Sequence, residues 1–447
     1  MPRLVLLSVI DCLRADHVSA YGYARETTPT LDEVARGGVL WRHAQAASSW
    51  TKPSVASLLT GAYPSQHGAF QGVKRNGRGR AVTTDAISAE TPTLAERFSQ
   101  AGWRCGAFIN NAQLDEFTGL HRGFETYQPR AGKADRILAS LEQWLRADAD
   151  RPAFAYLHFL EAHWPYKPRR RHIAQFGGDR DTNVFSRYSA RDFGRLRREV
   201  ARGEATLSAE ELKQMIQMYD GAVRRLDGKL KRVLRMLEGL GLRDETALFV
   251  TADHGEEFLE HGRIGHGHDL AQEVIHVPLV ASIPGLPRPE IRCEPVGHVD
   301  LGTTMLHTAG IADSDEPNLL NGVDSLRPVV SELRIRRRYT QALRRGKWKL
   351  QRRYAFECDD ADALRNTPHE LARTMPYKLE CELYDLDADP AEQRNLAGQT
   401  SAQAPLAELT ASLDRWWDAT AAKQSGTCEI EIDKDVVERL RALGYMD

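Results

Sequence analysis

Short runs of consecutive apolar residues, separated by longer stretches with helical periodicity, most constrain the fold of this chain. The apolar runs are Leu4–Ile10, Cys105–Ile109, Ala153–Phe159, Ala247–Thr251 and Val277–Ser282. A strand that is apolar along its whole length is typical of a parallel sheet, where both faces are covered. The helical stretches are Thr91–Ala101, Ala134–Arg146 and Ser208–Leu240. This alternation predicts an α/β fold with a mostly parallel central sheet flanked by helices.

Polar residues that can bind a metal ion or take part in catalysis lie just after two of these runs. Asp11 comes after Leu4–Ile10, and Asp253 and His254 come after Ala247–Thr251. In open parallel sheets, function collects at the carboxyl ends of the strands. We therefore expect these side chains to lie at one edge of the sheet.

The last part of the chain has a different character. Thr340–Leu350 and Glu382–Leu386 are expected to be strands of a small antiparallel sheet, and Ala404–Ala422 a helix. The chain has 447 residues, of which 42% are hydrophobic, enough for one large domain and a smaller one. We predict a catalytic α/β domain over residues 1–330 and a small C-terminal α+β subdomain over residues 331–447.

Composition argues against several classes of partner. The net charge of −2 gives no global attraction to nucleic acid or membrane, so neither is expected as a partner. The six cysteines are scattered without the spacing of a metal site. The apolar run Leu4–Ile10 is too short to span a membrane, and no signal peptide is visible. A cytoplasmic protein is expected.

The segment from Ser49 to Gly68 reads SWTKPSVASLLTGAYPSQHG. It resembles the signature of the sulfatase family, within the alkaline phosphatase superfamily, where the position of Thr51 holds the covalent nucleophile. A true sulfatase has Cys or Ser there, followed by x-Pro-x-Arg, and oxidises it to formylglycine. This chain has Thr51, and Val55 in place of the Arg. The segments Glu382–Pro390 and Leu440–Tyr445 also resemble this family, so the resemblance spans the chain and implies an alkaline-phosphatase-like fold.

The same resemblance implies a metal site. Asp11, Thr51, Asp253 and His254 match the positions of ligands to one divalent ion, although Cys12 stands where the family usually has a second acid. Asp and His together favour Zn²⁺ or Mn²⁺, while Ca²⁺ or Mg²⁺ suit an all-oxygen set. No Asp-x-x-x-His motif for a second ion is found. The structural alternatives are that Asp11 caps a strand end and that Thr51 caps a helix.

Two histidines complete the implied site. The family places a histidine at the position of His163 and a Lys or His at that of His266. Their task is to bind the oxygens of the transferred group and to protonate the leaving alkoxide. Lys52, His158 and His268 are further candidates for substrate binding. Taken singly, each of these side chains could also be structural.

These residues predict a metal-dependent hydrolase of an anionic ester, a phosphodiester or phosphonate ester, acting through a covalent intermediate on Thr51. A cation at the hydroxyl would stabilise the alkoxide. Lys167–Arg202 carries eleven Lys and Arg against four Asp and Glu and could steer an anionic small-molecule or conjugate substrate. The alternatives are a sulfatase without formylglycine, a phosphotransferase with the same site, and a catalytically inactive binding homologue.

Overall fold

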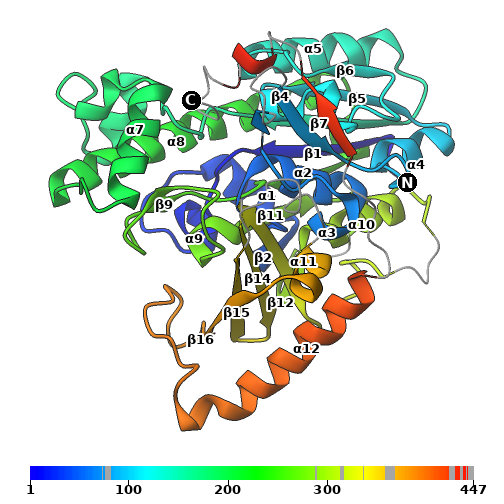
Figure 1. Ribbon diagram of the computed structural model, residues 1–447. Coiled ribbons are helices and arrows are strands. Elements are labelled where there is room, and N and C mark those ends of the chain that lie inside the picture. The colour runs from blue at the N-terminus through cyan, green and yellow to red at the C-terminus, as the bar shows by residue number, and fades with distance from the viewer. Residues whose placement is uncertain are drawn as a thin grey trace.

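The computed structural model describes residues 1–72, 74–75, 82–286, 289–312, 317–335, 337–357, 368–421, 428–432, 436–438 and 440. An eight-stranded sheet runs through the centre of the molecule, with helices packed on it (Figure 1). Its strand order is β12-β2-β11-β8-β1-β7-β5-β6. The predicted α/β fold with a central sheet flanked by helices is confirmed.

The first strand, β1 (Leu4–Ile10), lies inside this sheet and is buried over its whole length. Its two neighbours, β7 (Ala153–Phe159) and β8 (Thr246–Thr251), run parallel to it. The carboxyl ends of these strands therefore meet at one edge of the sheet. The other members are β2 (Val39–Gln45), β5 (Arg104–Ile109), β6 (Thr126–Gln128), β11 (His276–Ser282) and β12 (Glu290–Gly297).

One apolar run has the opposite direction. β11 pairs antiparallel with both β8 and β2, although its sequence, Val277–Ser282, has the same apolar character as the parallel strands. The strand is buried because it lies inside the sheet, between β2 and β8. Continuous apolarity thus reports burial on both faces and does not report strand direction.

The α-helices of the described residues are α1 (Pro29–Gly37), α2 (Thr51–Thr60), α3 (Pro64–His67), α4 (Leu94–Gln100), α5 (Ala134–Ala147), α6 (Arg170–Ile173), α7 (Ala190–Ala201), α8 (Ala209–Gly239), α9 (Gln272–Ile275), α10 (Leu301–Thr308), α11 (Pro368–Thr374) and α12 (Gln403–Ala421). The helices predicted at Ala134–Arg146, Ser208–Leu240 and Ala404–Ala422 agree with α5, α8 and α12 within one residue at each end. The start predicted at Thr91 is wrong. The helix begins at Leu94, because the hydroxyl of Thr93 accepts a 3.1 Å hydrogen bond from the amide of Glu96 and caps it there.

Helices α4 and α5 cover opposite faces of the sheet. Cys105 lies beside Phe154 in the register of β5 and β7, so Phe154 and Phe108 point to opposite sides. Phe98 of α4 stacks on Phe154 with 4.6 Å between ring centroids. Trp144 of α5 meets Phe108 edge-on at 5.8 Å. Because aromatic packing covers both faces of the sheet, polar functional side chains can gather only at the ends of its strands.

A smaller antiparallel sheet follows, as predicted. It consists of β13 (Val329–Ile335), β14 (Arg338–Arg345), β15 (Trp348–Phe356) and β16 (Tyr377–Asp385). The predicted single strand Thr340–Leu350 is wrong: it covers the end of β14, a turn and the start of β15. Gly346 makes this turn at φ 57°, a left-handed conformation that glycine adopts readily.

This small sheet has its own hydrophobic core against α12. Leu343, Leu350 and Leu383 of the sheet pack with Leu409 and Leu413 of the helix. Figure 1 shows α12 and the small sheet together at the bottom of the molecule. Residue 330 lies inside β13, so the predicted boundary after it cuts the first strand of this sheet.

Short strands tie other segments together. They are β3 (Lys74–Arg75), β4 (Val82–Ala86) and β17 (Cys428–Glu431) in one sheet, and β9 (Glu257–Phe258) with β10 (Ile264–Gly265) in another. Among the helices that the structure describes, none combines the length and apolarity needed to cross a bilayer.

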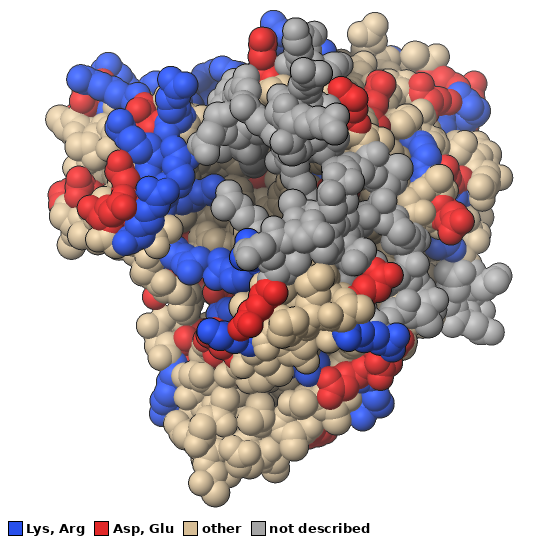
Figure 2. All heavy atoms as spheres, in the orientation of Figure 1, with Lys and Arg blue, Asp and Glu red and all other residues tan. Residues whose placement is uncertain are grey.

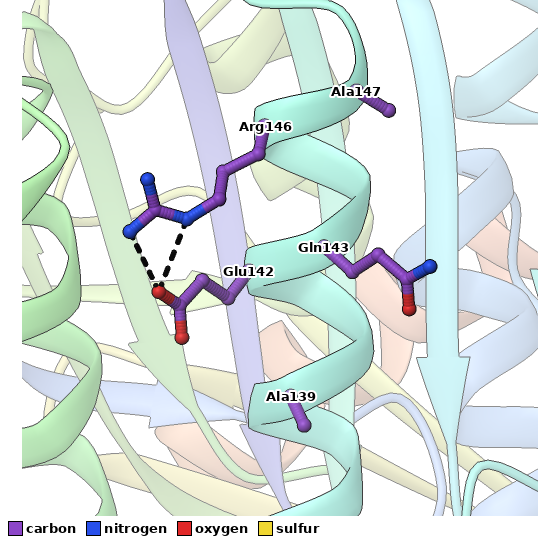
Figure 3. Close-up of a pocket in the computed structure, with 5 residues that line it drawn as sticks. All are labelled: Ala139, Glu142, Gln143, Arg146 and Ala147. Carbon is purple, nitrogen blue, oxygen red and sulfur yellow. Dashed lines mark hydrogen bonds and ion pairs between the residues drawn. The ribbon is translucent and has the colours of Figure 1, made fainter.

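A hollow on the surface of α5 is separate from the polar residues at the strand ends. It is lined by Ala139, Glu142, Gln143, Arg146 and Ala147, all from one helix (Figure 3). Glu142 and Arg146 pair with each other at 2.9 Å. This hollow shares no residue with the edge of the sheet where the polar side chains gather.

Candidate active site

Asp11 follows β1 and is held by donors from two neighbouring segments. Its Oδ2 accepts a 2.7 Å hydrogen bond from Nδ2 of Asn111 and lies 3.1 Å from Nε2 of His158. The hydroxyl of Tyr156 lies 2.8 Å from the other ring nitrogen of His158. Burial by itself raises the pKa of Asp11, but the contact with His158 and the neighbouring imidazoles lower it well below its ordinary value. Asp11 is therefore a fixed, ionised carboxylate.

Asp253 and His254 follow β8, beside Asp11. Oδ1 of Asp253 accepts hydrogen bonds from the amides of Cys12, at 3.3 Å, and His254, at 3.0 Å. Oδ2 of Asp253 is buried and has no hydrogen-bond partner. Burial and the negative charge of Asp11 raise the pKa of Asp253. An orphaned carboxylate oxygen in a buried site is costly unless something else binds there.

Thr51 is the first residue of α2 and is completely buried. Its Oγ1 lies 3.3 Å from Nε2 of His254. The Nδ1 of His254 is 2.8 Å from the carbonyl oxygen of Gly255 and donates to it, so Nε2 presents a lone pair toward Thr51. The amino-terminal end of α2 carries partial positive charge, which favours an anion beside Thr51.

The predicted ligands meet around Nε2 of His254. That nitrogen lies 3.5 Å from Oδ2 of Asp253 and 3.7 Å from Oδ1 of Asp11. Burial lowers the pKa of His254, but Asp253 and Asp11 together raise it above its ordinary value. Two carboxylates, an imidazole lone pair and a hydroxyl that face one point fit a divalent cation, because a cation offsets their mutual repulsion. The structure thus brings together all four residues predicted to bind metal.

His163 and His266 lie side by side above this group, with 5.1 Å between their ring centroids. His266 is also 4.4 Å from the ring of His254. His163 and His266 are 6% and 7% exposed, whereas Asp11, Asp253 and His254 are fully buried. The two rings are therefore slightly more exposed than the predicted metal ligands.

A carboxylate that the sequence interpretation did not assign holds His266. Oε1 of Glu256 lies 3.0 Å from Nδ1 of His266, and its Oε2 accepts a 3.0 Å hydrogen bond from Tyr166. Burial lowers the pKa of His266 to about 3, although Glu256 acts in the opposite direction. His163 is oriented in a similar way, because its Nδ1 lies 2.5 Å from the carbonyl oxygen of Trp164. The carboxylate of Glu256 and the carbonyl oxygen of Trp164 thus hold the Nδ1 atoms of the two rings.

The structure places the three predicted substrate-binding residues in other contacts. The buried ammonium of Lys52 donates to Thr84 at 2.8 Å, to a carboxylate oxygen of Asp85 at 2.7 Å, and to the carbonyl oxygens of Asp85 and Gln71. His158 uses both ring nitrogens on Asp11 and Tyr156. His268 lies 2.6 Å from Glu257. These contacts favour positioning roles for Lys52 and His158, and we leave both out of the proposed substrate contacts.

Asn111, Glu256 and Tyr166 are the positioning residues that sequence reasoning missed. Glu256 lies only a few residues after Asp253 and His254 in the sequence, and this proximity could have indicated a role for it. Asn111 and Tyr166 reach the site from the ends of β5 and β7, and nothing in their local sequence indicates their partners.

A second group of ligand-type side chains lies among the described residues. His261, Glu273 and Glu392 have ligand atoms within 4.8 Å of one another. Nε2 of His261 lies 3.2 Å from Glu273, and Glu392 pairs with Lys349 at 2.6 Å. The group already contains a cation, so its charges are balanced without a metal ion.

Arginine side chains gather next to the site. Arg169, Arg170, Arg171, Arg187, Arg191, Arg195, Arg198 and Arg202 are exposed along α6, α7 and the segment between them. Figure 2 shows a dense group of Lys and Arg over the part of the molecule where Figure 1 places α7, next to a hollowed region. Arg197 of α7 donates to the carbonyl oxygen of His266 at 3.3 Å, which links this basic surface to the site.

Comparison with known proteins identifies relatives of the whole chain. The sequence model described as Sulfatase matches residues 3–311. The low-salt glycan biosynthesis sulfotransferase Agl7 of Haloferax volcanii is 25% identical over 433 residues, which cover 90% of this chain and 89% of that protein. The delta 4,5-hexuronate-2-O-sulfatase of Bacteroides thetaiotaomicron is 24% identical over 484 residues, which cover 98% and 93%.

Solved structures show the same fold. The phosphonate monoester hydrolase of Agrobacterium radiobacter superimposes with a TM-score of 0.70 and 19% identity, and the match covers 94% of this chain and 96% of that one. The similarity extends past the central sheet into the small antiparallel sheet, because nearly the full length of both chains is matched.

Proposed function

The chain belongs to the sulfatase family, and from this premise we propose that it cleaves a phosphodiester or phosphonate ester through a covalent intermediate on Thr51. One observation carries the proposal. The hydroxyl of Thr51, at a buried helix amino terminus, lies 3.3 Å from Nε2 of His254, and the same nitrogen lies 3.7 Å from the carboxylate of Asp11 and 3.5 Å from that of Asp253.

The predicted nucleophile, Thr51, limits which atom can attack the ester. Threonine cannot be converted to formylglycine, so the attacking group is the side-chain hydroxyl itself. Oγ1 of Thr51 forms a bond to phosphorus while the bond from phosphorus to the leaving oxygen breaks. A water molecule then cleaves the ester on Thr51 and regenerates the hydroxyl. The β-branched side chain has few rotamers, which helps to hold Oγ1 in line.

The residues around Thr51 fit one divalent ion, held by Asp11, Asp253, His254 and the Thr51 hydroxyl. Such an ion supplies charge stabilisation for the alkoxide of Thr51 and for an oxygen of the ester. The imidazole nitrogen favours Zn²⁺ or Mn²⁺ over Ca²⁺ or Mg²⁺.

His163 and His266 act on the substrate itself. We expect them to bind oxygens of the transferred group. One of them passes a proton to the leaving oxygen. Glu256 opposes the effect of burial on His266, because a carboxylate at Nδ1 stabilises the charged form of the ring.

The basic surface over α7 supports an anionic substrate. It is connected to the site through Arg197 and His266, and it raises the local concentration of anions at the entrance. This supports a substrate with more negative charge than the ester group alone, such as a charged conjugate.

A sulfate ester is the second candidate, because two of the relatives are named as a sulfotransferase and a sulfatase. The same residues can bind a sulfate group. Hydrolysis of a sulfated threonine lacks the hemiacetal route of formylglycine enzymes, so we expect slow turnover with water. Transfer to an alcohol uses the same site. The retention of all the predicted metal ligands, His163 and His266 speaks against a catalytically inactive binding homologue.

The proposal is tested with a substrate panel. Aryl phosphomonoester, phosphodiester, phosphonate and sulfate ester are each assayed with Zn²⁺, Mn²⁺, Ca²⁺ and Mg²⁺ added to the metal-free protein. We expect the phosphodiester or phosphonate ester to react fastest, with Zn²⁺ or Mn²⁺. Turnover limited to the sulfate ester supports the second candidate, and no metal-dependent turnover of any ester contradicts both.

A further inference from the structure

Cys12 occupies an unusual place in the site. It follows Asp11, is fully buried, and has φ 62°, a left-handed conformation that is uncommon for a residue other than glycine. Its amide donates to Oδ1 of Asp253 at 3.3 Å, and its carbonyl oxygen accepts a 2.7 Å hydrogen bond from Tyr219. These two bonds fix the backbone, and the side chain is directed toward the predicted metal ligands.

The thiol lies among ligand atoms. Sγ of Cys12 is 3.1 Å from Oδ1 of Asp11 and 3.6 Å from Nδ1 of His266. Cys12, His254 and His266 can offer one ligand atom each with all of these atoms within 4.8 Å of one another. Cys12 forms a second such group with Asp11 and His163. The sulfur therefore belongs to the same cluster as the imidazole and carboxylate groups.

A second observation supports a cation beside Cys12. Oδ2 of Asp253 is buried without a hydrogen-bond partner, while Oδ1 of the same carboxylate is bound to the amide of Cys12. The unpartnered oxygen lies 3.5 Å from Nε2 of His254, within the cluster that Cys12 joins. A buried carboxylate oxygen without a partner, beside a thiol and imidazoles, is accounted for if a cation binds there.

We propose that Cys12 is a further ligand of the ion held by Asp11, Asp253 and His254, and that its thiolate makes the site select Zn²⁺ over Ca²⁺ and Mg²⁺. The inference rests on the metal site of the proposed function. When the bond from sulfur to the metal forms, the S–H bond breaks and its proton leaves to solvent, with no change in oxidation state. Thiolate is a soft ligand that Zn²⁺ binds well, whereas Ca²⁺ and Mg²⁺ prefer oxygen.

The test replaces the ion with Co²⁺, which reports on its ligands by absorption. Co²⁺ bound to a thiolate gives a charge-transfer band in the near ultraviolet, and Co²⁺ bound only to oxygen and nitrogen does not. Metal-free wild-type protein, Cys12→Ser and Cys293→Ser are titrated with Co²⁺, and bound metal is counted separately. Cys293 is exposed on β12, so its substitution controls for binding by an unrelated thiol.

We expect the band at one equivalent of Co²⁺ in the wild type and in Cys293→Ser, and its loss in Cys12→Ser. We also expect Cys12→Ser to bind Zn²⁺ at least about tenfold more weakly and to discriminate less against Ca²⁺. Stoichiometric Co²⁺ without the band overturns the role of Cys12 and leaves the metal site intact. Failure of every protein to bind any divalent ion overturns the metal site itself, and with it this inference.

A measurement on the wild type alone covers the case in which Cys12→Ser does not fold. X-ray absorption of the zinc-loaded protein detects a sulfur neighbour at about 2.3 Å, a distance distinct from that of nitrogen and oxygen ligands. A spectrum fitted by one sulfur supports the inference. A spectrum that needs only nitrogen and oxygen overturns it.

Discussion

The hydroxyl of Thr51 lies 3.3 Å from Nε2 of His254, and the carbonyl oxygen of Gly255 accepts a hydrogen bond from Nδ1, the other ring nitrogen. The neutral form of this ring, which a bound cation would require, presents its lone pair at Nε2 to Thr51 and to the carboxylates of Asp11 and Asp253. The arrangement suits a hydroxyl and an imidazole that share a cation. Because each role belongs to a different side chain, substitutions of single residues can test the roles one at a time.

Thr51→Ala is expected to reduce kcat by at least about 10⁴-fold, because it removes the attacking atom and leaves the metal ligands on other elements. Thr51→Ser keeps the hydroxyl and is expected to retain measurable turnover. Steady-state kinetics measure both, and mass spectrometry of the rapidly quenched wild type should find the added group on the peptide that contains Thr51. Thr60→Ala makes the same change at the other end of α2 and serves as the control. Full activity in Thr51→Ala is incompatible with the mechanism.

Asp253→Asn is expected to lose metal and activity together, since it removes one of the charges that hold the ion. Its effect on stability depends on the metal. In the metal-free protein the substitution removes the repulsion between two buried carboxylates, so the free energy of unfolding should be equal to or above that of the wild type.

Thermal unfolding with and without Zn²⁺ separates these effects. The wild type should gain stability when Zn²⁺ is added, and Asp253→Asn should gain little. Asp148→Asn, at the exposed end of α5, is a control that should respond to Zn²⁺ as the wild type does. An equal response of wild type and Asp253→Asn to Zn²⁺ contradicts the assignment of this ligand.

Glu256→Gln tests whether the carboxylate positions His266 for proton transfer. The negative charge of Glu256 acts to raise the pKa of His266, against the effect of burial. Its removal should lower that pKa further, so the limb of kcat/KM that requires protonated His266 moves to lower pH. We expect kcat to fall by about 10²-fold with little change in KM, measured over a pH series. An unchanged pH profile contradicts the role.

Much of the site could be predicted because its residues follow strands that are recognisable from their apolar runs. Asp11, Asp253 and His254 come directly after β1 and β8, and parallel pairing brings those strand ends together. The partner of Lys52 could not be predicted in this way. Its ammonium binds Asp85, 33 residues away, and only the packing of the chain beside α2 brings the two side chains together.

His261 gives a prediction about stability and pH. The contact with Glu273 raises the pKa of His261 to about 9, with burial opposing and Glu257 and Glu392 adding to the rise. Since the folded-state pKa lies above the ordinary histidine value, the contribution to stability is fully present below that value and is lost as the pH rises to about 9.

His261→Gln should therefore lower the free energy of unfolding by about 1 kcal/mol in mildly acid solution, the size expected for a partly exposed pair. Above the raised pKa the wild type and the variant should be nearly equally stable. Urea unfolding at the two pH values measures the difference. An equal loss of stability at both shows that the ring acts by packing and not by its charge.

The arginines of α7 are expected to act on substrate capture and not on the chemical step. Arg191 and Arg195 are exposed on α7, and Arg197 of the same helix bonds to the carbonyl oxygen of His266, so the basic surface begins at the site. The double substitution Arg191→Glu and Arg195→Glu should raise KM for an anionic ester by about tenfold at low salt and leave kcat unchanged. Added salt should reduce the difference, because it screens exposed charges.

The control reverses two charges elsewhere on the molecule. Lys231 and Arg235 are exposed on α8, well beyond Tyr219, the residue of that helix that bonds to Cys12. At 1.5 Å per residue they lie roughly 18 to 24 Å further along the helix, so their field at the entrance is largely screened in physiological salt. Lys231→Glu with Arg235→Glu should therefore leave KM unchanged. If both double variants raise KM equally, the effect comes from net charge, and the α7 surface has no special part in binding the substrate.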